Sequence, residues 1–137
     1  MRLIPYLNFD GTCAEAFRFY ERVLGGQAQI MRMGDTPMAP DLPPEVHDRI
    51  MHAYLEAGGA VLMGSDTPLG QSVKPEGLAV ALTTEDPAEA ERIFNELADG
   101  GTITMPIQQT FWAQRFGMLV DRYGIPWLIN GGTPEEG

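Results

Sequence analysis

The chain has 137 residues, 44% of them hydrophobic and 20% charged, which suits one globular domain with a sizeable core. Its formal net charge of −10 argues against binding of nucleic acid, because an acidic surface repels phosphate backbones. The sequence has no apolar run of about 18 residues, and its first residues, MRLIPYLNF, turn polar too soon for a signal peptide. We therefore expect a cytoplasmic protein without membrane contact. A lone cysteine, Cys13, excludes an internal disulfide and a cysteine-based metal site.

The first predicted helix begins after Thr12. Thr12 is a favourable N-cap residue, and Glu15, three positions later, completes a capping box. An apolar stripe with helical spacing follows, formed by Ala16, Phe17, Tyr20 and Leu24. Gly25 and Gly26 then end the helix.

The same signals recur in the second half of the chain at one constant offset. Asp86 takes the N-cap position, Pro87 the first helical position and Glu89 the capping-box position. Phe94 corresponds to Tyr20 in the apolar stripe. Because the cap, the stripe and the stop all repeat together, the sequence predicts two copies of one supersecondary unit.

Strand-like segments surround both predicted helices in the same order, with turn residues such as Gly58-Gly59 between them. One strand precedes each helix and three follow it, at residues 3–9, 27–33, 49–57 and 60–65 and at residues 78–83, 102–107, 115–121 and 126–130. Each half is therefore predicted to be β-α-β-β-β. We expect an α+β fold in a single domain, 1–137, with one module at about 1–70 and the other at about 77–131.

A proline-rich loop, TPMAPDLPP, spans Thr36 to Pro44 and has no counterpart in the second half. Its prolines exclude a regular helix or a central strand. It is either a surface connection or a flap over a pocket, with Met38 and Leu42 pointing inward.

The strand at residues 49–57 alternates between two faces. One face carries Met51, Ala53, Leu55 and Ala57 and should pack under the helices, whereas the other carries His52, Tyr54 and Glu56. If the two sheets curl toward one another, this polar face lines a cleft; if they stay open, it is solvated. His52 has the chemistry of a general base beside Glu56, although the sequence places no nucleophile near it.

The stretch TFWAQRFGMLVDRYGIPW is rich in aromatic residues and contains the last predicted hairpin. Within it Phe116, Met118 and Val120 share one strand face and Arg115, Gly117 and Leu119 the other, so about half of these side chains should be core, with Trp127. Phe111 and Trp112 precede the strand. They are either the wall of a ligand pocket or part of a dimer interface.

These features together resemble the vicinal oxygen chelate superfamily, which includes glyoxalase I, extradiol dioxygenases and the bleomycin- and fosfomycin-resistance proteins. The finer resemblance is to its PhnB-like branch. It is carried by AEAFRFY followed by LGG, by His52-Ala53 with Gly58-Gly59, by LMGSD, and by TFWA, RFG, DRYG and Trp127 near the end. The resemblance implies paired modules that form a curved mixed sheet around a cleft, often at a subunit boundary, and hence a homodimer.

The resemblance also implies, for catalytic members, a divalent metal held by four side chains on the first and last strand of each module. Here those strands, at residues 1–9, 60–64, 78–82 and 124–129, contain no His, Asp, Glu, Gln or Cys. We therefore expect no superfamily metal site and no cofactor. The alternative is a displaced metal site on His47, His52, Glu56 or Asp66.

The sequence thus favours a protein that binds a small molecule without a metal, in a cleft lined by His52, Tyr54, Glu56, Phe111, Trp112 and Arg115. Two other functions stay open: a metal-dependent lyase, isomerase or dioxygenase, and a protein that acts through its dimer surface on another protein. The PhnB-like branch also carries a demethylubiquinone methyltransferase label. Asp10-Gly11-Thr12 is not the glycine-rich turn that binding of S-adenosylmethionine commonly needs. Whether the protein is an enzyme is left open.

Overall fold

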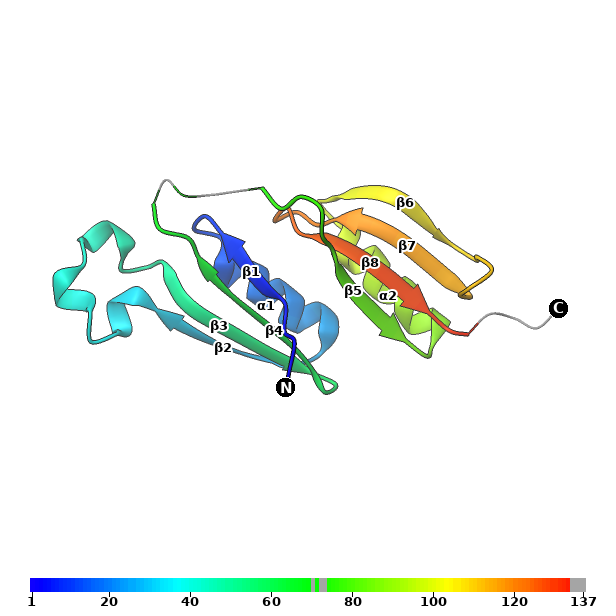
Figure 1. Ribbon diagram of the computed structural model, residues 1–137, viewed down its shortest axis with the longest axis horizontal. Helices are drawn as coiled ribbons and strands as arrows, with labels where there is room; N and C mark the ends of the chain where they lie inside the picture. Colours follow the sequence, from blue (N-terminus) through cyan, green and yellow to red (C-terminus); the bar gives the residue numbers. More distant parts are fainter. Residues whose placement is uncertain (70, 72–73, 134–137) are drawn as a thin grey trace. The chain divides into compact units, whose positions relative to one another are not determined.

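The computed structural model describes residues 1–69, 71 and 74–133 (Figure 1). The chain divides between residues 73 and 74 into two compact units. Each unit is a four-stranded mixed sheet with one helix, so the predicted α+β class with two similar β-α-β-β-β modules is confirmed. The predicted end of the first module, near residue 70, lies outside the described residues.

The first unit contains β1 (Tyr6–Phe9), α1 (Cys13–Leu24), β2 (Gln27–Arg32), β3 (Ile50–Ala57) and β4 (Ala60–Asp66). Its strands are ordered β1-β4-β3-β2. The first and last strands of the unit are parallel neighbours, and the other pairs are antiparallel. This order places β1 beside a strand that follows it by more than fifty residues, so the unit closes only through long-range pairing.

The second unit repeats this topology with β5 (Val80–Thr84), α2 (Pro87–Ala98), β6 (Thr102–Gln108), β7 (Arg115–Val120) and β8 (Pro126–Gly131). Its order is β5-β8-β7-β6, again with the first and last strands parallel. Both helices have 12 residues. In the part of the chain that the structure describes, neither is long and apolar enough to cross a membrane.

The start of α1 differs from the prediction. Thr12 occupies the N-cap position, but its side chain makes no capping hydrogen bond. Instead Asp66, from the end of β4, accepts hydrogen bonds at Oδ1 from the backbone N–H groups of Gly11 (2.8 Å) and Cys13 (3.1 Å), and at Oδ2 from that of Ile50 (2.8 Å). The predicted capping box is therefore wrong, because a buried carboxylate from a distant strand satisfies the free N–H groups of the helix.

The start of α2 agrees with the prediction at Asp86 and Pro87, whereas the Glu89 carboxylate pairs with Arg92 and not with the cap. Asp86 is the N-cap residue, and its Oδ1 accepts a hydrogen bond from the backbone N–H of Ala88 at 2.9 Å. Pro87 takes the first helical position, where its missing N–H costs nothing. At the other end of α1, Gly25 has a φ of 76°, the left-handed conformation with which helices commonly end.

Each helix packs closely on one face of its own sheet. In the first unit Phe17 and Tyr20 are fully buried, and a Cβ on Gly64 of β4 would lie only 2.7 Å from Cε2 of Phe17. In the second unit a Cβ on Gly117 would lie 2.5 Å from Cε2 of Phe94. Glycine therefore lets a helix aromatic approach the strand backbone in both units, and these contacts mark the helix side of each sheet.

The last hairpin is organised by a second buried carboxylate, that of Asp121, which is 3% exposed. Its Oδ1 accepts hydrogen bonds from the backbone N–H groups of Tyr123 (2.8 Å) and Ile125 (3.0 Å). Its Oδ2 accepts one from Nε1 of Trp127 at 2.9 Å. Trp127 is 1% exposed and belongs to the core, as predicted.

The strand β3 departs from simple alternation near its start, where the register with β2 shifts and Met51 is the extra residue of a β-bulge. Ile50 is buried, whereas Met51 is 38% exposed. The prediction that Met51 lies on the buried face is therefore wrong, while Ala53 and Leu55 are buried as predicted.

Candidate functional site

The face of the first sheet opposite α1, called here the open face, carries the predicted site residues His52, Tyr54 and Glu56. Strand register aligns Gln29, Tyr54, Met63 and Tyr6 in one row across all four strands. His52 lies on the same face, opposite Met31 of β2. The predicted grouping of His52 with Tyr54 is therefore present, joined by side chains from β1, β2 and β4.

His52 has a partner that the sequence did not indicate. The hydroxyl of Tyr6 lies 3.4 Å from Nδ1 of His52, and the two ring centroids are 6.0 Å apart. Tyr6 is 48% exposed and His52 is half-buried. An imidazole beside a phenol offers both a hydrogen-bond donor and an acceptor to a bound molecule.

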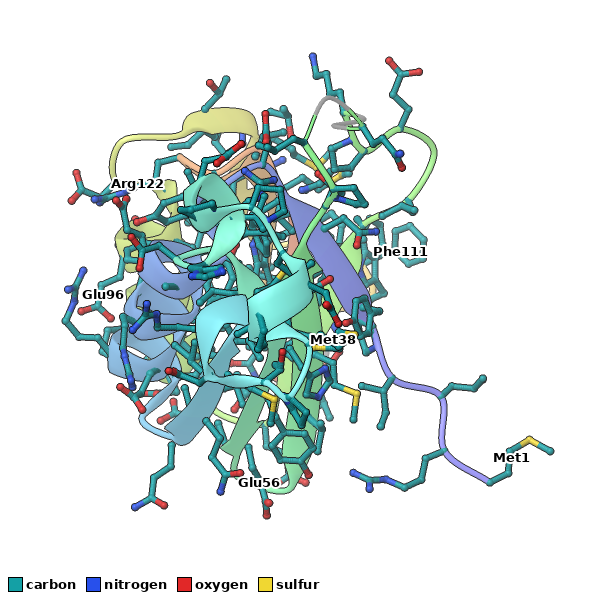
Figure 2. The ribbon with its side chains drawn as sticks, turned by 90° about the vertical axis from the view of Figure 1, so that its left-hand side faces the viewer. Met1, Met38, Glu56, Glu96, Phe111 and Arg122 are labelled. Carbon is teal, nitrogen blue, oxygen red and sulfur yellow. The ribbon has the colours of Figure 1, made fainter. Side chains whose placement is uncertain are left out.

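Glu56 lies at the other end of β3 from His52, paired with Gln27 and Val61, and points outward (Figure 2). Four residues of strand separate the two side chains by about 13 Å along the strand axis. Glu56 therefore adds negative charge at the edge of the open face and does not orient the imidazole.

The second unit gathers three aromatic rings at the loop before β7. Trp112 lies between Phe111 and Phe116, with centroid distances of 4.7 and 5.0 Å and nearly perpendicular ring planes. Phe111 is 88% exposed and Trp112 is 43% exposed, whereas Phe116 is 7% exposed. The loop thus presents two large apolar side chains outward from a buried ring.

Arg115 lies on the other face of β7 from Phe116. Its Nε is 3.5 Å from Oε2 of Glu91 in α2, and its Nη1 donates a hydrogen bond to the carbonyl oxygen of Gln114 at 2.8 Å. The structure therefore places Arg115 on the helix side of the second sheet, separated by the strand from the aromatic loop.

A cavity of about 310 Å³ lies in the first unit under the proline-rich loop. Met38 and Leu42 both line it, as predicted for a flap. The other walls of the cavity come from the two ends of the loop, from β3 and from the segment after β4, and no sequence pattern indicated them. The bulge in β3 explains one of them, because it turns Met51 away from the core.

The donors considered for a displaced metal site are engaged elsewhere or lie apart. Nε2 of His47 is 3.0 Å from the carbonyl oxygen of Ala39 and 3.1 Å from that of Leu42, so it donates to the loop backbone. Asp66 holds three backbone N–H groups on the helix side of the sheet. Among the described residues, no three His, Cys, Asp or Glu side chains gather in a way that could hold a metal ion.

The first and last strands of the two units do not fit the superfamily metal either. β4 extends beyond its predicted end and includes Asp66, but that carboxylate caps α1. On the faces opposite the helices, these four strands present apolar, hydroxyl and amide side chains, including Tyr6, Met63, Thr83 and Leu128. Such a set lacks the imidazole and carboxylate ligands that hold a divalent ion.

Comparisons with known proteins agree with the fold. A family model described as 3-demethylubiquinone-9 3-methyltransferase matches residues 1–130. The crystal structure of protein PA1353 from Pseudomonas aeruginosa is 42% identical, with a TM-score of 0.87 over 96% of this chain and 98% of that one. A putative 3-demethylubiquinone-9 3-methyltransferase, the PhnB protein from Bacillus cereus, is 25% identical, with a TM-score of 0.76 over 96% of this chain and all of the other.

A more distant structure shows the fold alone. It is a glyoxylase/bleomycin resistance protein/dioxygenase domain from Frankia sp. EAN1pec, 17% identical, with a TM-score of 0.70 over the whole of this chain and 93% of that one. The paired β-α-β-β-β modules are therefore the fold of the superfamily that the sequence resembles.

Proposed function

The chain belongs to the 3-demethylubiquinone-9 3-methyltransferase family, in the PhnB-like branch of the vicinal oxygen chelate superfamily, and we propose that it binds a small molecule on the open face of its first sheet. The observation that carries the proposal is the contact between the Tyr6 hydroxyl and the His52 imidazole. Neither group is buried, and both lie in a surface of aromatic and methionine side chains. A few placed polar groups within a largely apolar surface are typical of small-molecule sites.

The composition of the open face favours a neutral or weakly basic ligand with an aromatic ring. Tyr6 and Tyr54 offer ring faces, and Met31 and Met63 offer adaptable apolar contacts. Glu56 adds a negative charge at the edge, and the net charge of −10 acts in the same direction. Arg115 would have favoured a ligand with a carboxylate, but it lies in the second unit and pairs there with Glu91.

The proposal is independent of a metal. The strands that would supply the superfamily ligands offer no imidazole or carboxylate on the faces opposite the helices, so the proposed binding uses no metal ion. Metal-dependent chemistry through His52 predicts near-stoichiometric metal in the untagged protein and its loss in His52→Ala. Elemental analysis before and after dialysis against chelator measures both.

The methyl transfer in the family name needs a site for S-adenosylmethionine. The turn between β1 and α1 does not provide one, because the N–H groups of Gly11 and Cys13 are bonded to the carboxylate of Asp66. Titration with S-adenosylmethionine in a calorimeter tests this directly, and we expect no heat of binding.

The main experiment uses carbon-13 methyl-labelled methionine. The chain has eight methionines, and Met31 and Met63 report on the open face. A library of neutral aromatic fragments is screened by the methyl resonances. We expect binders to shift Met31 and Met63, and Tyr6→Ala and His52→Ala to abolish those shifts.

Arg18→Ala, on the exposed side of α1, is the matched control and should bind the same fragments as the unaltered protein. If no fragment moves Met31 or Met63, or if Tyr6→Ala and His52→Ala bind as well as Arg18→Ala, the open face is not the site.

A further inference from the structure

The cavity under the proline-rich loop is separate from the open face and has its own walls, and this inference does not depend on the function proposed above. The loop with its two ends, the start of β3 and the segment after β4 meet at the cavity. Its lining is almost wholly apolar and consists of Met33, Met38, Leu42, Pro43, Val46, Arg49, Met51, Pro68 and Leu69.

The single charged residue in the lining, Arg49, is already paired. Its Nη2 donates a hydrogen bond to Oδ1 of Asp10 at 2.9 Å, and its Nε donates to the carbonyl oxygen of Thr67 at 3.1 Å. The Arg49 side chain is only 11% exposed. The cation is thus neutralised and turned toward Asp10, so an anionic ligand gains little from it.

The loop that covers the cavity is held in place by its own hydrogen bonds. The loop and the residues on either side of it form three short 3-10 turns, at Met33–Asp35, Ala39–Asp41 and Pro44–Val46. Nε2 of His47 ties the carbonyl groups of Ala39 and Leu42 together. The backbone N–H of Gly34 donates to the carbonyl oxygen of His47 at 2.9 Å, which joins the two ends of the loop. The walls are therefore formed before a ligand arrives, which lowers the entropic cost of binding.

Several lining side chains remain open to solvent although they are apolar. Met38 is 46% exposed, Met51 is 38% exposed and Leu69 is 55% exposed. Figure 2 shows Met38 on the loop. Covering such side chains with an apolar ligand is favourable because it removes apolar surface from water.

We propose that this cavity, the loop pocket, is a second binding site, for a neutral and predominantly apolar small molecule. Its volume of about 310 Å³ is at the lower end of the range for small-molecule sites, roughly 300–1,000 Å³. This is small for a helix or a strand of a partner protein. Three methionines in the lining let the surface adapt to the shape of an apolar ligand.

The test uses N-phenyl-1-naphthylamine, a neutral apolar probe that fluoresces in apolar surroundings. We expect saturable binding with shifts of the methyl resonances of Met33, Met38 and Met51. The resonances of Met105 and Met118, in the second unit, should stay unchanged.

Two lysine variants form a matched pair. Met51→Lys places a charge in the wall of the loop pocket, and Ile103→Lys places one at a strand position of β6 that is 50% exposed and outside the pocket. We expect Met51→Lys to weaken probe binding at least about tenfold, because an apolar ligand would desolvate the ammonium group. Ile103→Lys should change the affinity less than about twofold.

Thermal unfolding of both variants tests whether they remain folded. Met38→Lys, on the loop, replaces Met51→Lys if Met51→Lys does not fold. Equal weakening by the two lysines, or probe shifts confined to methionines outside the pocket, overturns the proposal. It is also overturned if Met38→Lys changes the molar mass in solution, because the pocket would then be covered by a second copy of the chain.

Discussion

Removing the carboxylate of Asp66 should lower the free energy of unfolding more than a typical single substitution does. It is 3% exposed and accepts hydrogen bonds from three backbone N–H groups, at the start of α1 and at the start of β3. Asp66→Ala leaves these donors without a partner in a buried place. A hydrogen bond to a charged group contributes about 1.5–3 kcal/mol. Allowing for relaxation and for water reaching Gly11, we expect a loss of about 3–5 kcal/mol.

That loss is large beside the total stability of about 5–15 kcal/mol that is typical of a native protein. Urea unfolding at neutral pH, followed by tryptophan fluorescence and by circular dichroism, measures it as a shift of the midpoint at constant slope. The matched variant is Thr12→Ala at the N-cap of α1. Because the Thr12 side chain makes no capping hydrogen bond, we expect it to cost less than about 0.5 kcal/mol.

The pair of variants separates two explanations of how α1 begins. If Thr12 capped the helix, as the local sequence suggests, Thr12→Ala would cost about 1 kcal/mol. A loss of less than about 1 kcal/mol of unfolding free energy in Asp66→Ala would refute the long-range cap, because leaving three buried donors unpaired should destabilise the fold by more than that.

Three further predictions concern other parts of the chain. Burial, with a smaller effect from the charge of Asp66, raises the pKa of Cys13 to about 12. The folded protein should therefore resist a disulfide reagent at pH 8, and labelling as fast as in urea would contradict the raised pKa. Its stability should fall as the pH rises from about 9, where the thiol of the unfolded chain ionises, toward 12. Trp127→Phe, which removes the donor to Asp121, should cost about 1–3 kcal/mol in urea unfolding, whereas Trp112→Phe should stay within about 0.5 kcal/mol. The predicted homodimer should show twice the chain mass of 15.0 kDa in light scattering, and a return of Trp112→Ala to the mass of one chain would place Trp112 in the interface.

The elements of the fold could be predicted because their signals are local. Asp86 and Pro87 lie next to the helix that they start, and Gly25 lies next to the helix that it ends. The Asp66 cap was missed because its partners at Gly11 and Cys13 are more than fifty positions away, and no local pattern records such a pairing.

The placement of the candidate site residues could be predicted from the sequence only where alternation along one strand decides it. Alternation along β3 correctly joined His52 to Tyr54, but the contact with Tyr6 depends on the parallel pairing of β1 with β4. Arg115 was grouped with the cleft residues although alternation places it on the same face as Leu119, which is buried. The structure agrees with alternation, because Nε of Arg115 lies 3.5 Å from Oε2 of Glu91 in α2, on the helix side of the second sheet.

The pairing of β1 with β4 also sets an order of events during synthesis. A nascent chain that has not yet emerged as far as Asp66 has neither the cap of α1 nor the neighbour of β1, so Phe17 and Tyr20 lack a complete sheet to pack on. Once Thr67 has emerged and its N–H donates to the carbonyl oxygen of Phe9, the sheet of the first unit has all its strands. The first unit can then form before the second has emerged from the ribosome, as domains in longer chains commonly do.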